Sequence, residues 1–152
     1  MSQCRSPGRV PRSELVFLAL GSNLGDRSAN LAAARSRITA LPNCEVVAES
    51  AIEETEPIGG VPQGYFLNQM LAVRTSLSPR ELLSQCLEIE TLGGRRRVDR
   101  WGPRSIDIDI GVFGDREVRE PDLQIPHPEI SNREFWKREM TELSGALHTD
   151  DE

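Results

Sequence analysis

The segment 105–113 constrains the fold more than any other part of the chain. It alternates apolar and acidic side chains in the order Ile106, Asp107, Ile108, Asp109 and Ile110. Because successive side chains of a β-strand point to opposite faces, this alternation predicts a strand with an acidic face and an apolar face that Val112 continues. The apolar face predicts a hydrophobic core on one side of a sheet, and the two carboxylates on the other side need a separate explanation.

Apolar spacing and capping residues predict the other elements. They indicate strands over 14–20, 44–55 and 65–75, helices over 27–41, 79–92 and 131–143, and a Pro-bounded loop at 121–128. Asp26 is placed to cap the first helix, and Ser78, followed by Pro79 and Glu81, is a strong start for the second. The order strand, helix, strand, strand, helix, strand is the ferredoxin-like α+β arrangement, in which helices pack on one face of an antiparallel sheet.

The chain has the length of one domain. It contains 152 residues, of which 38% are hydrophobic, enough for a single core. We expect one domain over 14–145, a mobile tail over 1–13 and an acidic tail over 146–152. The longest apolar run, residues 15–20, is far shorter than a membrane span, and residues 1–13 lack the apolar stretch of a signal peptide. We therefore expect a cytoplasmic protein that does not bind membranes.

The cysteines predict no covalent or metal framework. Cys4, Cys44 and Cys86 are odd in number, widely spaced and without CxxC pairing, which argues against both disulfides and structural zinc. Cys86 lies within the predicted second helix. Together with its neighbours Leu82, Leu83, Leu87 and Ile89, it is expected to fill the buried face of that helix.

The paired aspartates predict a metal site. Asp107 and Asp109 would stand roughly 7 Å apart on one strand face. Two carboxylates placed in this way repel each other unless a cation lies between them, and aspartate is depleted in strands. Mg²⁺ binds one or two carboxylates together with phosphate oxygens and water. The alternative is a solvated strand face.

Basic residues before this strand predict a phosphate ligand. Five arginines precede it, namely Arg95, Arg96, Arg97, Arg100 and Arg104. Guanidinium groups match phosphate oxygens, so beside the carboxylates they indicate a polyphosphate bridged by Mg²⁺. A basic surface loop or a nucleic-acid contact would also explain the arginines, but the net charge of −6 and the aspartates disfavour nucleic acid. Residues 21–26 lack the Lys-Ser/Thr ending of a P-loop. The prolines on both sides of His127 fix the direction of its ring, so it is either a structural histidine, the more common case, or one that could donate to a phosphate.

Six stretches, in the same order along the chain, resemble one family. They are residues 19–26, 54–57, 66–68, 100–104 with Asp107 and Asp109, 113–115 and 126–128. Together they resemble the 6-hydroxymethyl-7,8-dihydropterin pyrophosphokinases of folate biosynthesis, over residues 15–135. The resemblance implies transfer of the diphosphate of ATP to the hydroxymethyl group of the pterin, with release of AMP. ATP and the pterin are then the partners, and neither nucleic acid nor an obligate protein partner is expected.

The resemblance also implies roles for individual residues. Asp107 and Asp109 would hold two Mg²⁺ ions that bridge the ATP phosphates and the pterin hydroxyl. Catalytic, phosphate-facing arginines would be Arg95, Arg97 and Arg104, and the nucleotide side would be Glu90, Arg104 and His127. The pterin site would comprise Thr55, Pro57, Ile58, Phe66, Asn68, Trp101 and Phe135. In it, the two phenylalanines would sandwich the ring and Asn68 would pair with its edge, while Trp101 would close over the site.

Two features depart from the family pattern. After Phe135 the chain is polar and helical in character where the family continues with an apolar, strand-like stretch, and the stretch from Glu90 to Trp101 is slightly short. Two other classes of function stay open. A non-catalytic nucleotide-binding module would be expected to have lost one of the aspartates, and an RNA-binding module of this fold would expose aromatics on its central strands.

Overall fold

The computed structural model describes residues 13–57, 64–94 and 105–150 of the chain. Its elements in chain order are β1 (Glu14–Ser22), α1 (Arg27–Thr39), β2 (Cys44–Glu49), β3 (Glu53–Thr55), β4 (Phe66–Thr75), α2 (Pro79–Leu92), β5 (Asp107–Phe113), β6 (Val118–Glu120), β7 (Leu123–Ile125), the 3₁₀ turn η1 (Ile130–Asn132) and α3 (Glu134–Asp150). The predicted tail over 1–13 lies almost wholly outside the described residues.

The main sheet confirms the predicted α+β ferredoxin-like arrangement. Its strands follow the order β2-β4-β1-β5, and β3 continues the pairing with β4 beyond the end of β2. All of these pairings are antiparallel. β1 lies in the middle, between β4 and β5, as this topology requires.

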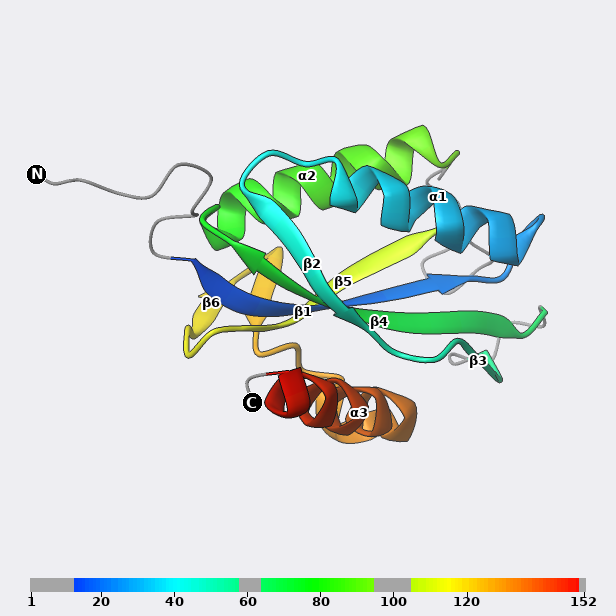
Figure 1. Ribbon diagram of the computed structural model, residues 1–152. Coiled ribbons are helices and arrows are strands. Elements are labelled where there is room, and N and C mark those ends of the chain that lie inside the picture. Colours follow the sequence, from blue (N-terminus) through cyan, green and yellow to red (C-terminus); the bar gives the residue numbers. More distant parts are fainter. Residues whose placement is uncertain (1–12, 58–63, 95–104, 151–152) are drawn as a thin grey trace, which may run out of the picture.

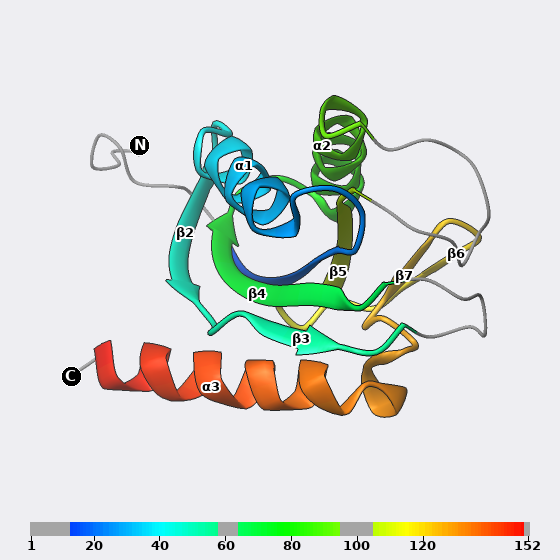
Figure 2. The same cartoon turned by 90° about the vertical axis from the view of Figure 1, so that its right-hand side faces the viewer.

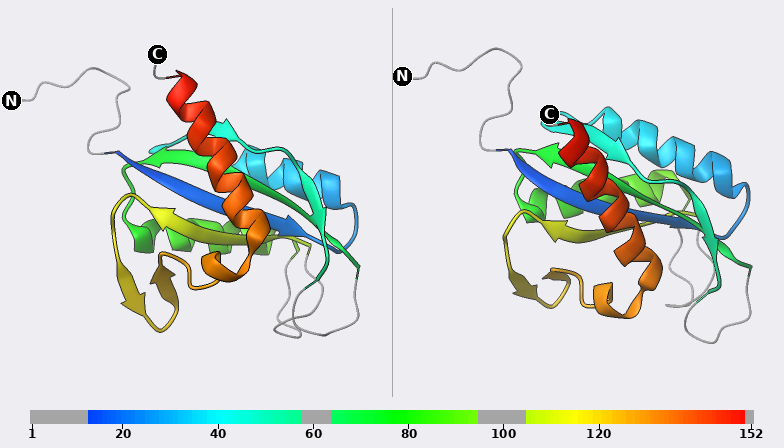
Figure 3. Two further views of the ribbon diagram at one scale, coloured as in Figure 1. Left: turned by 90° about the horizontal axis from the view of Figure 1, so that it is seen from below. Right: turned by 60° about the horizontal axis from the view of Figure 1, so that its bottom comes forward.

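Helices cover both faces of the sheet. α1 and α2 lie side by side on one face, and α3 runs across the other (Figures 1 and 2). The view from below shows α3 crossing the sheet obliquely (Figure 3). The two helices of the predicted unit therefore pack on one face, as expected, whereas the third helix, α3, which the sequence did not assign to a face, covers the other. The spacing of apolar residues identifies the buried side of a helix, but it does not say which face of the sheet receives that side.

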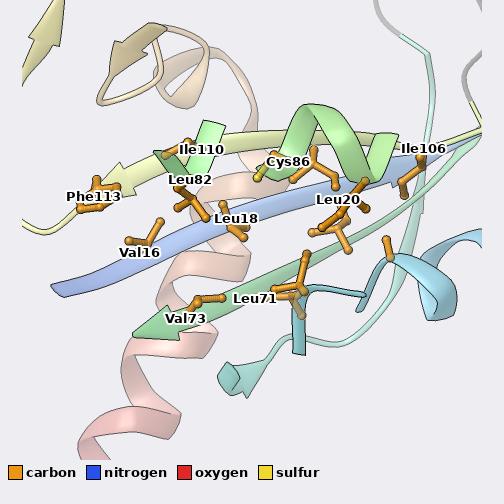
Figure 4. Packing of buried hydrophobic residues seen from close by; sticks show 14 of the residues in the cluster. Val16, Leu18, Leu20, Leu71, Val73, Leu82, Cys86, Ile106, Ile110 and Phe113 are labelled. Atoms are coloured by element: carbon orange, nitrogen blue, oxygen red, sulfur yellow. The ribbon is translucent and has the colours of Figure 1, made fainter. Parts of the chain in front are cut away.

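The larger core lies between the sheet and the first two helices. Leu82 and Cys86 of α2 pack there against strand residues such as Leu18 and Ile110 (Figure 4). Cys86 is 1% exposed, which confirms its expected burial, and burial raises the pKa of its thiol. A smaller core under α3 contains Ala19, Met70, Ala72, Trp136 and Leu143.

A bulge at Gly111 changes the faces of β5. Ile110 pairs with Leu18 and Val112 pairs with Phe17, so Gly111 has no partner opposite it in β1. An extra residue of this kind reverses the alternation of side chains. Phe113 therefore joins the larger core in place of Val112, which is only half-buried, contrary to expectation.

Several boundaries differ from the prediction. The expected strand over 44–55 is interrupted at residues 50–52, and part of the expected loop at 121–128 belongs to the β6–β7 hairpin. The helix expected over 131–143 runs instead from Glu134 to Asp150, so that it continues through part of the expected acidic tail. Both predicted caps are present, because Asp26 accepts from the Ala29 N–H and Ser78 forms a capping box with Glu81. In the part of the chain that the structure describes, no helix is long and apolar enough to cross a membrane.

Candidate active site

An open cavity of about 560 Å³ lies at the start of the edge strand β5 and is lined from both sides of the sheet, because α2 and α3 both contribute residues to it. Its floor is formed by β1, β4 and β5, and its walls come from β3, α2, the β6–β7 hairpin and the first turn of α3. A volume of this size is suited to a small organic ligand.

Strand register places a predicted metal ligand and a predicted pterin contact in one row. Gly21 of β1 pairs with Asn68 of β4 on one side and with Asp107 of β5 on the other. Directly opposite residues in a sheet share a face, so the Asp107 carboxylate and the Asn68 amide lie on the same face, with only a glycine between them. All three residues line the cavity. A Cβ atom on Gly21 would lie 3.3 Å from Asn68 Oδ1 and 3.3 Å from the Phe66 ring, so glycine leaves this row open.

Asp109 lies next to a fixed histidine. The Nε2 atom of His127 is 3.7 Å from Asp109 Oδ1. The backbone N–H of Glu129 donates to His127 Nδ1 at 3.1 Å, which in a neutral ring assigns the ring proton to Nε2, on the side of Asp109. The His127 backbone N–H donates to the Gly111 carbonyl at 2.8 Å, and its ring meets the Trp136 ring edge-on at 5.0 Å between centroids. The structure thus places His127 beside the carboxylate of Asp109.

Glu90 joins α2 to the acidic strand. It is 3% exposed, and its Oε2 accepts from the Ile108 backbone N–H at 2.7 Å, between the two aspartates in sequence. Glu90 also lines the cavity. The predicted nucleotide-side glutamate is therefore at the site, where it also holds the carboxylate-bearing strand against α2.

The predicted pterin side is assembled from three elements. Asn68 Nδ2 donates to Thr55 Oγ1 at 2.5 Å, so the amide is oriented by a neighbour on β3. Phe66 of β4 and Phe135 of α3 both line the cavity. Pro57 does not line it, although its neighbour Glu56 does.

The remaining predicted residues lie outside the described part of the chain. These are Ile58, Arg95, Arg97, Trp101 and Arg104, as well as the other two arginines of the basic stretch, Arg96 and Arg100.

Sequence reasoning missed several cavity residues. The Arg133 guanidinium lies 4.4 Å from the centroid of the Trp136 ring, and both side chains line the cavity beside His127. The available sequence signal was their position beside the predicted pterin residue Phe135: Arg133 directly precedes residues 134–135, and Trp136 directly follows them. Leu83 and Leu87 were expected in the core, yet both line the cavity and Leu87 is 51% exposed.

The described side chains are suited to a hard cation and an organic ring. Asp107 and Asp109 provide carboxylate oxygens on one face, the type of ligand that Mg²⁺ prefers. Among the described residues, no group of three or more His, Cys, Asp or Glu could hold a metal ion. Mg²⁺ that accompanies a nucleotide commonly has one or two carboxylates as protein ligands, together with phosphate oxygens and water.

Comparison with known proteins identifies the family. Residues 17–145 match the model of the 7,8-dihydro-6-hydroxymethylpterin-pyrophosphokinase (HPPK) family. The chain belongs to the HPPK family. It is 42% identical over 132 residues to the 2-amino-4-hydroxy-6-hydroxymethyldihydropteridine pyrophosphokinase of Methylorubrum extorquens, covering 87% of this chain and 84% of that protein. Proteins with the same description from Bacillus subtilis and Aquifex aeolicus are 37% and 38% identical, over 86% and 84% of this chain and 78% and 79% of theirs.

Membership of the HPPK family settles the class of function. The chain is an enzyme of the pyrophosphokinase class, and the two alternatives, a non-catalytic module and an RNA-binding module, are not favoured. The HPPK match includes residues 136–143, the segment that departed from the expected family pattern. In the structure this segment is helical, and its first residue, Trp136, and the preceding Phe135 both line the cavity.

Proposed function

We propose that this protein transfers the diphosphate of ATP to the hydroxymethyl group of 6-hydroxymethyl-7,8-dihydropterin in folate biosynthesis, in the cytoplasm and with Mg²⁺. In this reaction the pterin hydroxyl oxygen forms a bond to the β-phosphorus of ATP. The bond from that phosphorus to the oxygen bridging it to the α-phosphorus breaks, the hydroxyl proton is released, and AMP leaves. Membership of the HPPK family and the names of the relatives support this assignment.

One observation carries the proposal. Asp107, Gly21 and Asn68 form a continuous row across the cavity floor, so a carboxylate suited to a metal and an amide suited to a heterocycle share one open face. A pterin whose edge pairs with Asn68 would direct its hydroxymethyl group along the row towards the carboxylates. Reacting groups held in this way gain rate through proximity and orientation.

The two ends of the cavity differ in chemistry. Phe66 and Phe135 offer aromatic surface for the flat pterin ring, with Asn68 oriented by Thr55 at its edge. At the carboxylate end, His127 presents the Nε2 donor to an acceptor such as a phosphate oxygen. We assign the pterin to the first end and the ATP phosphates to the second.

Asp107 and Asp109 would hold the Mg²⁺ ions, two by resemblance to the family. When bound, Mg²⁺ neutralises charge on the phosphates and lowers the pKa of a coordinated hydroxyl. The protein's own contribution is to fix the two carboxylates on one strand, because Glu90 fixes the backbone between them. Arg95, Arg97 and Arg104 are proposed to face the phosphates, and Ile58 and Trp101 to contact the pterin, from sequence alone.

The proposal can be tested by measuring the formation of AMP from ATP in three aspartate variants. Asp107→Asn and Asp109→Asn keep the side-chain size but remove the charge, and each is expected to lower turnover by about two orders of magnitude or more. Asp115→Asn is the matched control, because Asp115 is exposed and lies just beyond the far end of the same strand. Circular dichroism checks that all three fold. Near wild-type turnover in Asp107→Asn or Asp109→Asn would refute the metal-ligand role.

A further inference from the structure

The β6–β7 hairpin forms one wall of the cavity but is a small sheet of its own. It consists of only two strands and is not part of the main sheet. Leu123 and Ile125 of its second strand are buried in the larger core, whereas Glu120 and Asp122 are exposed. An isolated two-stranded hairpin is marginally stable, so the position of its tip (residues 120–122) depends on contacts with the rest of the protein.

Arg80, the second residue of α2, supplies such contacts. Its Nη1 donates to Asp122 Oδ2 at 2.9 Å and its Nη2 donates to Asp122 Oδ1 at 2.6 Å. The same Nη2 also donates to Glu120 Oε1. One guanidinium therefore joins both carboxylates of the hairpin tip to the first turn of α2, and its hydrogen bonds lower the pKa of Asp122.

The geometry of this contact is more consequential than its energy. The Arg80 and Asp122 side chains are 48% and 65% exposed, and exposed ion pairs contribute little to stability. A bidentate guanidinium–carboxylate pair nevertheless fixes distance and orientation. The two elements that Arg80 joins both line the cavity, with Leu83 and Leu87 on α2 and Leu123 and Gln124 on the hairpin.

We propose that Arg80 is a positioning residue for the nucleotide, because it holds the hairpin tip at a set distance from α2 and so maintains an apolar slot for the base of ATP. The inference rests on the proposed function. Leucines on both walls offer the apolar surface that a flat purine needs, and the phosphates would then extend from the slot towards His127. Arg80 acts through Glu120 and Asp122 and does not itself line the cavity.

Binding of a non-hydrolysable ATP analogue and hydrogen exchange in the hairpin test this role. Arg80→Ala is expected to weaken analogue binding roughly threefold to tenfold, the scale of a small network of exposed pairs. It should leave pterin binding unchanged and speed amide exchange at residues 119–124. Arg116→Ala is the matched control: it removes another arginine–glutamate pair, with the half-buried Glu14 at 2.8 Å, and neither partner lines the cavity. It should alter neither analogue binding nor exchange in the hairpin.

A double-mutant cycle separates positioning from direct contact. In a protein that carries both Glu120→Gln and Asp122→Asn, adding Arg80→Ala should have little further effect on analogue binding. If Arg80→Ala weakened analogue binding in that background as much as it does in the wild type, Arg80 would bind the nucleotide directly, and the inference would be overturned. Unchanged amide exchange in the hairpin of Arg80→Ala would also overturn it. Wild-type protein that does not bind the analogue would contradict the proposed function and this inference together. Wild-type protein that binds it, while Arg80→Ala binds it equally well, would overturn only this inference.

Discussion

Nε2 of His127 lies 3.7 Å from Oδ1 of Asp109, while Nδ1 of the same ring accepts a hydrogen bond from the Glu129 backbone. The two nitrogens therefore have different tasks. Nδ1 fixes the orientation of the ring, and Nε2 is the donor available at the carboxylate end of the cavity.

His127 can be tested with two amide variants. The amide nitrogen of glutamine reaches the position of Nε2, whereas the shorter asparagine reaches only that of Nδ1. We expect His127→Asn to lower kcat/KM for ATP about tenfold to a hundredfold, the cost of a lost hydrogen bond to a charged group, and His127→Gln to retain more activity. Steady-state kinetics with ATP as the varied substrate measures this difference. An asparagine variant as active as the glutamine variant would exclude Nε2 as the important donor.

The Asn68–Thr55 pair should control pterin affinity. Asn68→Ala is expected to weaken pterin binding by about 1–3 kcal/mol, because it leaves polar groups of the ligand unpaired. Thr55→Val removes the Oγ1 that accepts from Asn68 and should weaken binding by less, whereas Thr55→Ser keeps that acceptor and should bind almost normally. Calorimetric titration with the pterin measures all three. If Asn68→Ala bound the pterin as tightly as the wild type, the pterin site would be misplaced.

Gly21 keeps the row across the cavity floor open. In Gly21→Ala the new methyl group would lie 3.3 Å from both Asn68 Oδ1 and the Phe66 ring, so these groups must shift. We expect weaker pterin binding and little change in the binding of an ATP analogue. Gly145→Ala is the matched control, because a Cβ there meets nothing within 4 Å and alanine favours the helix by about 0.5–1 kcal/mol. Equal pterin affinities in the two glycine variants would contradict the role of Gly21.

Glu139 of α3 makes stability depend on pH. It is 2% exposed, and burial, followed by the neighbouring Glu53 carboxyl, raises its pKa above the usual 4.5, whereas Arg138 lowers it and Glu142 raises it further. A raised pKa means that the folded protein holds this proton more tightly than the unfolded chain. The wild type therefore loses stability as the pH rises above about 4.5, at up to about 1.4 kcal/mol for each pH unit, until the raised pKa is passed.

Glu139→Gln removes this titration. We expect its advantage in free energy of unfolding over the wild type to grow between pH 5 and pH 8, as measured by urea unfolding. Glu134→Gln, at an exposed position of the same helix, should show no such growing advantage. A difference between Glu139→Gln and the wild type that stays constant with pH would show that burial does not perturb this carboxyl.

The sequence predicted the acidic strand well because its information is local. Alternation of isoleucine and aspartate is enough to place the two carboxylates on one face, and the ferredoxin-like arrangement followed from the order of the elements. The exchange of Val112 for Phe113 in the core was not predictable from alternation, since it depends on the bulge at Gly111. The helical period identified the apolar side of α3 but could not assign it to the second face of the sheet.

The sequence pointed to those site residues that lie in family-like stretches, and it missed those that only the tertiary structure brings to the site. Asn68, Phe66 and His127 lie in stretches that resemble the family, and all line the cavity. Leu87 has the spacing of a core residue, but its side chain is about half exposed and lines the cavity. Apolar side chains form cavity walls as well as cores, so their spacing does not distinguish the two. The contact of Arg80 with Glu120 and Asp122 spans about forty residues and leaves no periodic signal.

The identity of the products tests the central claim most directly. Wild-type protein with ATP, Mg²⁺ and 6-hydroxymethyl-7,8-dihydropterin is analysed by mass spectrometry, with the pterin omitted in a parallel reaction. We predict a pterin that carries two added phosphates, one AMP for each, and no AMP when the pterin is absent. A pterin monophosphate with ADP, or AMP formed equally without the pterin, would contradict the assignment of this cavity as a diphosphate-transfer site.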